Sequence, residues 1–329
     1  AQIPGNYLFP SDSIHKIEIT FPQLNWWDSL TIYHENYLAG GNIQYIVADV
    51  KLDALQLNYV GIRLKGLSSY YQAVNNGGKK VSFKIDFNRY IPGQNFDGLR
   101  KINLNNGYND PTFMREKIFL DFLNRQSMFA PRCTYAELYI NGTYWGFYTL
   151  VEQVDRTFLE TKFGGNTGNL YKAASLGADL SLNSDPYIDY ILKTNQSIND
   201  RSDLINLIEV INDTANIQFK DSLETILATD YYLGIWAANN LFVNFDVYEY
   251  AANNYYIYDN PFDNKFYWIA WDVNSAFGGG WWNMSVAQKR NLSVYYLPDP
   301  PPVPLTDTVP LTLRMLQNSF YTEKYLNTI

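Results

Sequence analysis

The sequence has little cysteine and little histidine, and these shortages exclude a class of site. Cys133 is the single cysteine, so no internal disulfide can form. With His15 and His34 as the only histidines, a zinc site of Cys and His ligands is excluded as well. Any metal ion must therefore be held by oxygen ligands. The sequence also contains no run of about 18 apolar residues, so it predicts no membrane-spanning helix.

Charged residues are sparse, and positive charge is the scarcer sign. They make up 18% of the 329 residues, with 25 Lys and Arg against 33 Asp and Glu, which gives a net charge of −8. Nucleic-acid binding relies on Lys and Arg displacing counterions, so no nucleic-acid partner is expected. Hydrophobic residues make up 47% of the chain, which is enough for a large core in one big domain or two lobes.

The chain begins at Ala1-Gln2 without an initiator methionine. This start suggests either a mature chain after signal-peptide removal or a trimmed one, and the first possibility predicts a secreted or cell-surface protein. The glycosylation sequons favour the same location. They begin at Asn141, Asn195, Asn212, Asn283 and Asn291.

Residues 14 to 90 are mostly predicted to form strands. The segments IHKIEITF, NIQYIVADVKL, NYVGIRLKG and KVSFKIDF alternate and are rich in β-branched and aromatic residues. Residues 109 to 125 instead show helical spacing, with Asp110 as a capping residue and Pro111 at the first helical position. The sequence thus predicts an antiparallel sheet with one amphipathic helix packed on it.

Two further strands, TYAELYI and WGFYTLVE, are joined by Asn141-Gly142, a strong hairpin signal. They complete an antiparallel sheet of five or six strands. After Glu152 the pattern changes to helices and loops, which predicts a β-rich lobe at residues 1–152 and a mostly helical lobe at 153–329. Within the second lobe we expect one long buried helix, SLETILATDYYLGIWAANNLFV, and a β-hairpin, NYYIY with FYWIAW. The stretch LPDPPPVP is predicted to be a rigid surface loop.

Protein kinases have the same order of elements. Strands, a helix and a connector are followed by a helical lobe that carries an acid, a hairpin and a second acid. At this point the chain resembles the spore-coat-protein-H (CotH) kinase-like family of atypical secretory protein kinases. The matching motifs run in order over roughly residues 55 to 280. They are VGIRLKGLSS, KKVSFKIDF, LRKINLNN, DPTFMREKIFLDFL, APRCTYAELYINGTYWGFYTLVEQVDRTFL, GNLYK, NNLFVNFDVYEYAANNYYIYDN and WIAWDVNSAFG.

The resemblance implies a site of two acids and an amide. Asp272 in WDVNSAFG resembles the metal-binding acid of the kinase Asp-Phe-Gly motif, and Asp246 resembles the catalytic-loop acid that accepts or orients the proton of the substrate hydroxyl. Asn254 resembles the amide that holds a second metal ion, although Asn253 is equally available. The alternative for each is a local role, as a turn residue or a strand end.

The resemblance also implies residues that bind ATP. Lys84 and Glu116 would be the counterpart of the kinase lysine and helix glutamate, and Lys65 is the replacement phosphate ligand if Lys84 faces solvent. The family's Gly-Asn-Ser-Ser loop corresponds to Gly66-Leu67-Ser68-Ser69, with Leu in place of Asn. The backbone of Glu152 to Val154 would bind adenine.

The resulting interpretation is an α+β, bilobal protein-kinase-like fold with one helix in the position of the kinase αC helix and a catalytic hairpin. Its implied function is transfer of phosphate from ATP, with Mg²⁺ or Mn²⁺, to Ser or Thr of secreted or surface proteins. Two alternatives remain open. A pseudokinase or structural surface protein is favoured by Leu67, and a carbohydrate-binding module by the pairs Trp26-Trp27 and Trp281-Trp282.

Overall fold

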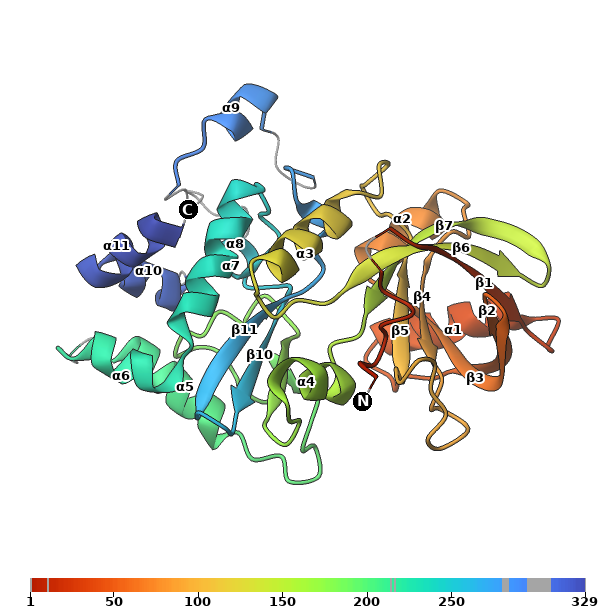
Figure 1. Cartoon of the computed structure of the whole chain (residues 1–329), viewed down its shortest axis with the longest axis horizontal. Coiled ribbons are helices and arrows are strands. Elements are labelled where there is room, and N and C mark those ends of the chain that lie inside the picture. Colours follow the sequence, from red (N-terminus) through yellow and green to blue (C-terminus); the bar gives the residue numbers. More distant parts are fainter. Residues whose placement is uncertain are drawn as a thin grey trace. The chain divides into compact units, whose positions relative to one another are not determined.

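The computed structural model of the chain describes residues 2–10, 12–213, 215, 217–279, 284–294 and 309–328. The chain divides into two compact units (Figure 1). The first consists of Ala1–Lys117 and Pro131–Thr161, and the second of Ile118–Ala130 and Lys162–Ile329. Both contain helices and strands, so the α+β composition is confirmed. Trp281-Trp282 and the Pro-rich stretch at 297–304 lie outside the described residues.

A closed barrel forms the centre of the first unit. Its seven strands, all within the described residues, follow the order β1-β2-β3-β4-β5-β7-β6. Their bounds are β1 (Ile14–Thr20), β2 (Ile46–Leu52), β3 (Leu55–Lys65), β4 (Ser82–Asp86), β5 (Lys101–Asn105), β6 (Cys133–Ile140) and β7 (Thr143–Glu152).

The barrel closes where β1 lies between β2 and β6. Ile17 of β1 is opposite Leu52 of the antiparallel strand β2 and opposite Leu138 of the parallel strand β6. All three side chains are buried, because alternate residues of each strand point into the core. The prediction of an antiparallel sheet with five or six strands is therefore wrong, since seven strands form the sheet and it closes on itself through one parallel pair.

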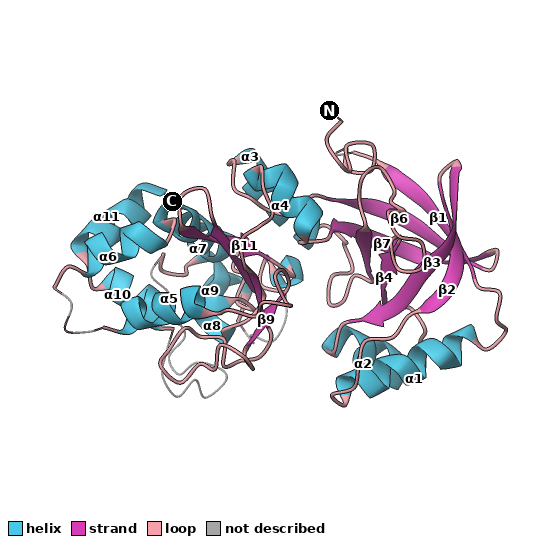
Figure 2. Cartoon of the chain, turned by 90° about the horizontal axis from the view of Figure 1, so that it is seen from below, coloured by secondary structure: helices cyan, strands magenta, loops and turns pink. Residues whose placement is uncertain are grey.

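Two helices that the sequence did not predict belong to the first unit. They are α1 (Trp26–Leu38) and α2 (Ser68–Asn75), and Figure 2 shows them beside the barrel strands. Trp26 stacks on Phe21, with ring centroids 4.7 Å apart, and its edge contacts Trp145 at 5.4 Å. The pair Trp26-Trp27 thus packs against the barrel core.

The predicted helix at 109–125 exists as α3 (Arg115–Arg125), but it begins later than expected. Phe113 has a positive φ of 57°, which a right-handed helix does not allow. Pro111 consequently lies in a turn before the helix. The Asp110 carboxylate still caps it, because it accepts from the backbone N–H of Arg115 at 2.9 Å.

The Asn141-Gly142 hairpin is confirmed. Both residues have positive φ, 48° and 79°, and they connect Ile140 of β6 to its partner Thr143 of β7. These are the signs of φ that a type I′ turn requires, which is why this dipeptide is so informative in a sequence.

The second unit holds a four-stranded antiparallel sheet in the order β11-β10-β8-β9 among the described residues. The strands are β8 (Leu170–Ala173), β9 (Tyr190–Leu192), β10 (Tyr255–Asn260) and β11 (Lys265–Ala270). The predicted hairpin is confirmed as β10 and β11, with Tyr255 opposite Ala270. The described helices that belong wholly or partly to this unit, besides α3, are α4 (Arg156–Phe163), α5 (Ser202–Asn212), α6 (Phe219–Ile226), α7 (Thr229–Leu241), α8 (Tyr248–Ala251), α9 (Val286–Arg290), α10 (Pro310–Leu316) and α11 (Ser319–Thr328).

The long helix predicted at 222–243 is divided into α6 and α7. Leu227 adopts an extended conformation, with φ −127° and ψ 135°, and forms a β-bridge with Phe266 of β11. The backbone N–H of Ala228 also donates to the carbonyl of Phe266 at 2.9 Å. The prediction of a single helix is wrong because this contact with the hairpin interrupts it.

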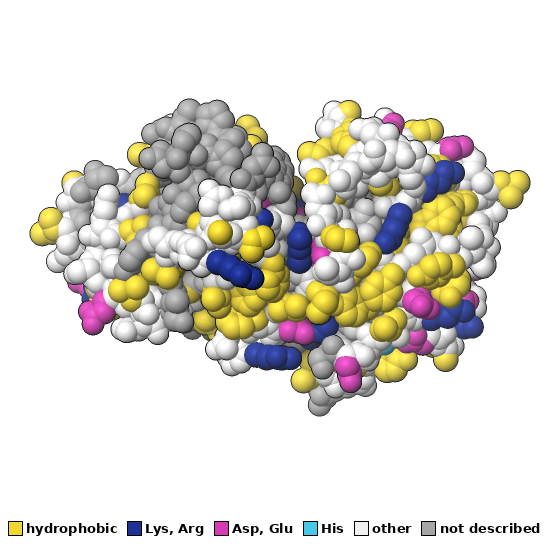
Figure 3. All heavy atoms as spheres, turned by 90° about the horizontal axis from the view of Figure 1, so that it is seen from above, with side chains coloured by type: hydrophobic (Ala, Val, Ile, Leu, Met, Phe, Trp, Pro, Cys, Tyr) yellow, Lys and Arg dark blue, Asp and Glu magenta, His cyan; other side chains and the backbone are white. Residues whose placement is uncertain are grey.

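No helix among the described residues has the length and apolar character needed to cross a membrane. Hydrophobic side chains are nevertheless exposed on the surface in Figure 3, where they share one face with lysines, arginines and a few acids.

Candidate functional site

Asp246 and Asn254 are joined directly within the second unit. Asp246 lies in the loop between α7 and α8, and Asn254 precedes β10. The side-chain Nδ2 of Asn254 donates to the backbone carbonyl of Asp246 at 2.8 Å. The carbonyl of Asn254 accepts from the N–H of Trp271 at 3.2 Å, which places Asp272 one residue beyond the paired end of the hairpin. The hairpin thereby brings the loops that carry Asp246 and Asp272 to one place.

Two backbone hydrogen bonds join the segment that follows Asp272 to the segment that precedes Asp246. The N–H of Phe277 donates to the carbonyl of Phe242 at 2.5 Å, and the N–H of Gly278 donates to the carbonyl of Val243 at 3.0 Å. The segment after Asp272 therefore lies beside the segment before Asp246. Lys289 adds a third contact, since its Nζ donates to the carbonyl of Gly278 at 2.8 Å.

The backbone around the two acids is strained. Five non-glycine residues here have positive φ values between 47° and 59°. They are Val243, Ala252, Asn254, Asp272 and Phe277. A β-branched residue such as Val243 is rarely found in this region, because its side chain clashes with its own backbone. Strain of this kind persists only where the surrounding structure enforces it, and it is concentrated at functional sites.

The carboxyl group of Asp246 has an altered acidity. Burial, followed by charge repulsion from the carboxylate of Asp272, raises its pKa to about 6, although the amides of Asn254 and Asn253 act in the opposite direction. This repulsion agrees with the hydrogen bonds that bring the loops of Asp246 and Asp272 together. At neutral pH, Asp246 is mostly ionised but close enough to its pKa to accept a proton.

A buried polar cluster lies next to this loop. Asn244 donates from Nδ2 to Oδ1 of Asn239 at 3.2 Å, and Asn239 donates from Nδ2 to Oε2 of Glu249 at 3.2 Å. Burial raises the pKa of Glu249 to about 7. The cluster attaches both ends of the Asp246 loop to α7, because Asn244 precedes Asp246 and Glu249 follows it.

In the first unit, Lys65 and Glu116 are linked through an amide. Lys65 Nζ donates to Asn105 Oδ1 at 2.7 Å, and Asn105 Nδ2 donates to both carboxylate oxygens of Glu116 at 2.8 and 3.1 Å. Lys65 lies on β3 and Asn105 on β5, with β4 between them. The side chain of Lys65 crosses β4 at the small residue Ser82, with which Lys65 is paired. Asn105 thus acts as a bridge between a cation and a carboxylate.

Lys84 is held by a different amide. Its Nζ donates to Oε1 of Gln153, the residue that follows β7. Asn103, which is paired with Lys84 across β4 and β5, donates from Nδ2 to the same oxygen at 3.3 Å. The predicted pair of Lys84 with Glu116 stays a prediction, since the contacts described here are those with Gln153 and Asn105.

The segment from Gly66 to Ser69 is a tight turn leading into α2. Gly66 has a φ of 89°, and a Cβ atom at this position would lie 2.2 Å from Oγ of Ser69. Ser68 and Ser69 are the first residues of α2, so the predicted phosphate loop takes the form of a strand, a glycine turn and a helix start. Backbone N–H groups at a helix start are suited to an anion.

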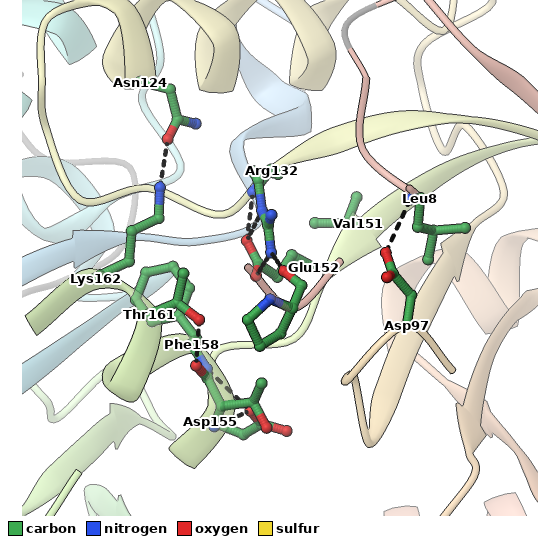
Figure 4. Close-up of polar contacts among 12 residues, drawn as sticks. Leu8, Asp97, Asn124, Arg132, Val151, Glu152, Asp155, Phe158, Thr161 and Lys162 are labelled. Atoms are coloured by element: carbon green, nitrogen blue, oxygen red, sulfur yellow. Dashed lines mark hydrogen bonds and ion pairs between the residues drawn. The ribbon is translucent and has the colours of Figure 1, made fainter. Parts of the chain in front are cut away.

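The predicted connector between the lobes, Glu152 to Val154, makes contacts with the barrel. Glu152 is 1% exposed and forms an ion pair with Arg132, with Oε1 2.5 Å from Nη2 and Oε2 2.9 Å from Nε (Figure 4). The N–H of Glu152 donates to the carbonyl of Arg132 at 2.9 Å. The carbonyl of Val154 accepts from Nε2 of Gln153 at 2.8 Å. The role of these groups in adenine binding stays a prediction.

The predicted site residues therefore form two groups, one in each unit. Asp246, Asn254 and Asp272 lie together in the second unit. The first unit contains the others, namely Lys65, Gly66, Ser68, Ser69, Lys84, Glu116, Glu152 and Val154. Sequence reasoning missed Asn103, Asn105 and Gln153, because an amide on a strand leaves no motif.

The site formed by Asp246, Asn254 and Asp272 fits a hard divalent cation. Two carboxylates and an amide oxygen are the ligands that Mg²⁺ and Mn²⁺ prefer, and Asn254 uses only its nitrogen in the bond to Asp246. No group of three His, Cys, Asp or Glu that could hold a metal occurs in the described parts of the chain. A metal here would thus need water or substrate oxygens to complete its coordination.

The fold and the site together define an α+β protein with a paired-acid centre at the base of a β-hairpin. Residues 62–329 match the family described as CotH kinase protein. The chain belongs to this family.

Three relatives are similar to the chain. It is 31% identical over 208 residues to inner spore coat protein H of Bacillus subtilis (strain 168), covering 61% of this chain and 55% of that protein. Two invasins of Rhizopus delemar are also similar. CotH3 is 23% identical over 78% of this chain and 49% of its own length, and CotH2 is 24% identical over 80% and 48%. The chain spans about half the length of these relatives.

Proposed function

We propose that the protein is an atypical protein kinase that transfers the γ-phosphate of ATP to Ser or Thr side chains of secreted or surface proteins. The proposal includes a bilobal kinase-like arrangement and dependence on Mg²⁺ or Mn²⁺. Membership of the CotH family supports it. The names of the relatives, a spore coat protein and two invasins, support a protein substrate at a surface.

One observation carries the proposal, which is the meeting of Asp246 and Asp272 within the second unit. Two carboxylates that repel each other are costly unless a cation or a proton compensates them. Phosphoryl transfer uses both, because a metal ion binds the phosphates and an acid receives the proton of the attacking hydroxyl. The strained backbone at Asn254 and Asp272 supports the same interpretation.

Each residue then has a defined part in the reaction. Asp246 accepts or orients the proton of the substrate hydroxyl, and its pKa of about 6 keeps it ionised at pH 7. Asp272 and Asn254 would hold the metal ion, which when bound would neutralise charge on the phosphates. Lys65 and Lys84 contact phosphate, Glu116 orients Lys65 through Asn105, and the turn at Gly66 offers backbone N–H groups.

The test is incubation of the protein with labelled ATP and Mn²⁺ or Mg²⁺. Transfer to the protein itself or to an acceptor is expected, and Asp272→Ala should lower its rate by more than ~10³-fold. Asp221→Ala is the matched control, since this acid of the same unit is 73% exposed. Equal rates for Asp272→Ala and the unchanged protein would contradict the proposal.

A second candidate is a pseudokinase that binds nucleotide without transferring phosphate. Leu67 favours it, because this exposed apolar residue stands where the family has an asparagine in the phosphate loop. A nucleotide-induced rise in melting temperature without any labelled product would support it. If the protein shows neither nucleotide binding nor phosphate transfer, the carbohydrate-binding alternative is favoured.

A further inference from the structure

We propose that Gln153 is a positioning residue that holds the ammonium group of Lys84 ready for a nucleotide phosphate and ties it to the connector after β7. The inference rests on the proposed function, because it assigns a task within the same ATP site. The backbone of Gln153 belongs to the predicted adenine-binding range, Glu152 to Val154, but the sequence predicted no role for its side chain.

The first argument is the placement of Lys84 on the outer face of the barrel. Its neighbours in the strand, Phe83 and Ile85, are fully buried, so Lys84 points away from the core. Across the sheet it is paired with Arg63 on β3 and Asn103 on β5. A lysine on this face needs a partner to hold one of its many rotamers, and Gln153 supplies one.

The second argument is that Gln153 uses both ends of its amide. Oε1 accepts from Lys84 and from Asn103 Nδ2, while Nε2 donates to the carbonyl of Val154 at 2.8 Å. Because a carbonyl can only accept, the amide nitrogen must face Val154 and the oxygen must face Lys84. The side chain is thereby locked, and it connects the lysine to the backbone carbonyl of the connector.

The third argument concerns Oδ1 of Asn103, an acceptor that takes no part in the hydrogen bonds between Lys84, Asn103 and Gln153. Asn103 Nδ2 donates to the carbonyl of Val151 at 3.2 Å and to Gln153, so its orientation is settled in the same way. Its Oδ1 is fully buried and has no hydrogen-bond partner among the residues that the structure describes. Buried acceptors in native proteins are satisfied, so this oxygen points to a donor from outside the chain, a water molecule or an N–H of a ligand.

The fourth argument is the chemistry of the acceptor. An amide oxygen fixes an ammonium group without cancelling its charge, whereas a carboxylate in the same place would form an ion pair. Since a carboxylate at position 153 would also repel a bound phosphate, a glutamine suits an anion-binding lysine better than a glutamate of equal size. Gln153→Glu therefore separates a positioning role from a purely structural one.

The experiment measures binding of MgATP, adenosine and inorganic triphosphate to the unchanged protein, Gln153→Glu, Lys84→Met and the double variant. Gln153→Glu should weaken MgATP and triphosphate binding by about tenfold or more, while adenosine binding changes by less than about threefold. In the Lys84→Met background the same substitution should have almost no effect, because the lysine through which Gln153 acts is gone.

Gln94→Glu is the matched control in the same unit. Gln94 also donates from Nε2 to backbone carbonyls, those of Asn58 and Phe87, so the substitution removes an equivalent donor. It should leave triphosphate binding unchanged. The melting temperature of each variant identifies any loss of folding, and a conservative Gln153→Asn variant tests whether a shorter amide recovers part of the binding.

The outcomes separate the two proposals. If the unchanged protein binds neither MgATP nor triphosphate, the proposed function is overturned together with this inference. If it binds them but Gln153→Glu weakens adenosine and triphosphate alike, or weakens binding equally with and without Lys84, Gln153 is structural and the inference alone is overturned.

Discussion

The side-chain amide of Asn254 donates to the backbone carbonyl of Asp246 at 2.8 Å, and this single bond connects the start of a β-hairpin to the loop after α7. Since the hairpin returns the chain to Asp272, the bond fixes the relation between the two acids.

The first prediction concerns pH and activity. Burial and the neighbouring Asp272 raise the pKa of Asp246 to about 6, so this carboxyl loses its ability to accept a proton as the pH falls through that value. The rate of phosphoryl transfer should therefore fall about tenfold per pH unit below pH ~6. In Asp272→Asn the repulsion is removed and the pKa of Asp246, followed by carbon-13 NMR of the carboxyl, should move down. An unchanged value would contradict the proximity of the two acids.

The second prediction concerns the stability of the buried Glu249. Burial raises its pKa from 4.5 to about 7, so the folded state binds a proton more tightly than the unfolded state. The stabilisation from this proton is fully present below pH ~4.5 and is lost as the pH rises through ~7. Glu249→Gln should thus be more stable than the unchanged protein by about 1–3 kcal/mol at pH 8, and nearly equal to it at low pH.

Urea denaturation at several pH values measures this difference. The exposed Glu209 of α5 provides the control, and Glu209→Gln should show a small effect that does not vary with pH. A difference for Glu249→Gln that is the same at pH 5 and pH 8 would show that the charge of this group has no part in stability.

The third prediction concerns the turn before α2. Gly66→Ala should destabilise the protein by about 2–4 kcal/mol, because it adds both an unfavourable positive φ and a clash with Ser69. Gly77→Ala is a close control, since Gly77 has a φ of 73° and open space around its missing Cβ. It should lose only about 1 kcal/mol. Adding Ser69→Ala to Gly66→Ala should recover part of the loss, and equal melting temperatures for the two glycine variants would contradict the clash.

The fourth prediction concerns the ion pair of Arg132 with Glu152. Arg132→Met leaves a carboxylate buried without its cation, so it should cost about 3–5 kcal/mol in the free energy of unfolding. Adding Glu152→Gln removes that charge and should restore at least half of the loss. Lys220→Met breaks the exposed pair with Asp221 and should cost less than about 1 kcal/mol. Similar losses in both lysine and arginine variants would argue against a buried pair at the connector.

Local signals in the sequence predicted local structure well. The Asn141-Gly142 turn and the hairpin of β10 and β11 are confirmed because a turn and its two strands are contiguous in the chain. The helix α1 was missed, since its sequence WWDSLTIYHENYL contains several β-prone aromatic and β-branched residues and has a weak apolar face. It is stabilised by packing on the barrel rather than by propensity.

Long-range contacts account for the remaining differences. The parallel pairing of β1 with β6 closes the barrel between strands that are far apart in the chain, which periodicity cannot reveal. The break at Leu227 follows from its bridge to Phe266, and no glycine or proline marks it. Similarly, the motif order predicted Asp246, Asn254 and Asp272, whereas Gln153 and Asn105 became visible only through their hydrogen bonds to Lys84 and Lys65.

The parallel seam between β1 and β6 also affects how this protein can meet other chains. Because the barrel is closed, each strand has hydrogen-bonded neighbours on both sides along part of its length, and unpaired edges are left at residues 55–60 of β3 and 143–148 of β7. Among the described residues of the second unit, the edges of the sheet are β9 and β11, and Leu227 already occupies a position beside β11. Recruitment of a partner by strand addition would therefore have to use one of the unpaired stretches of β3 and β7 or begin at β9, a segment of only three residues.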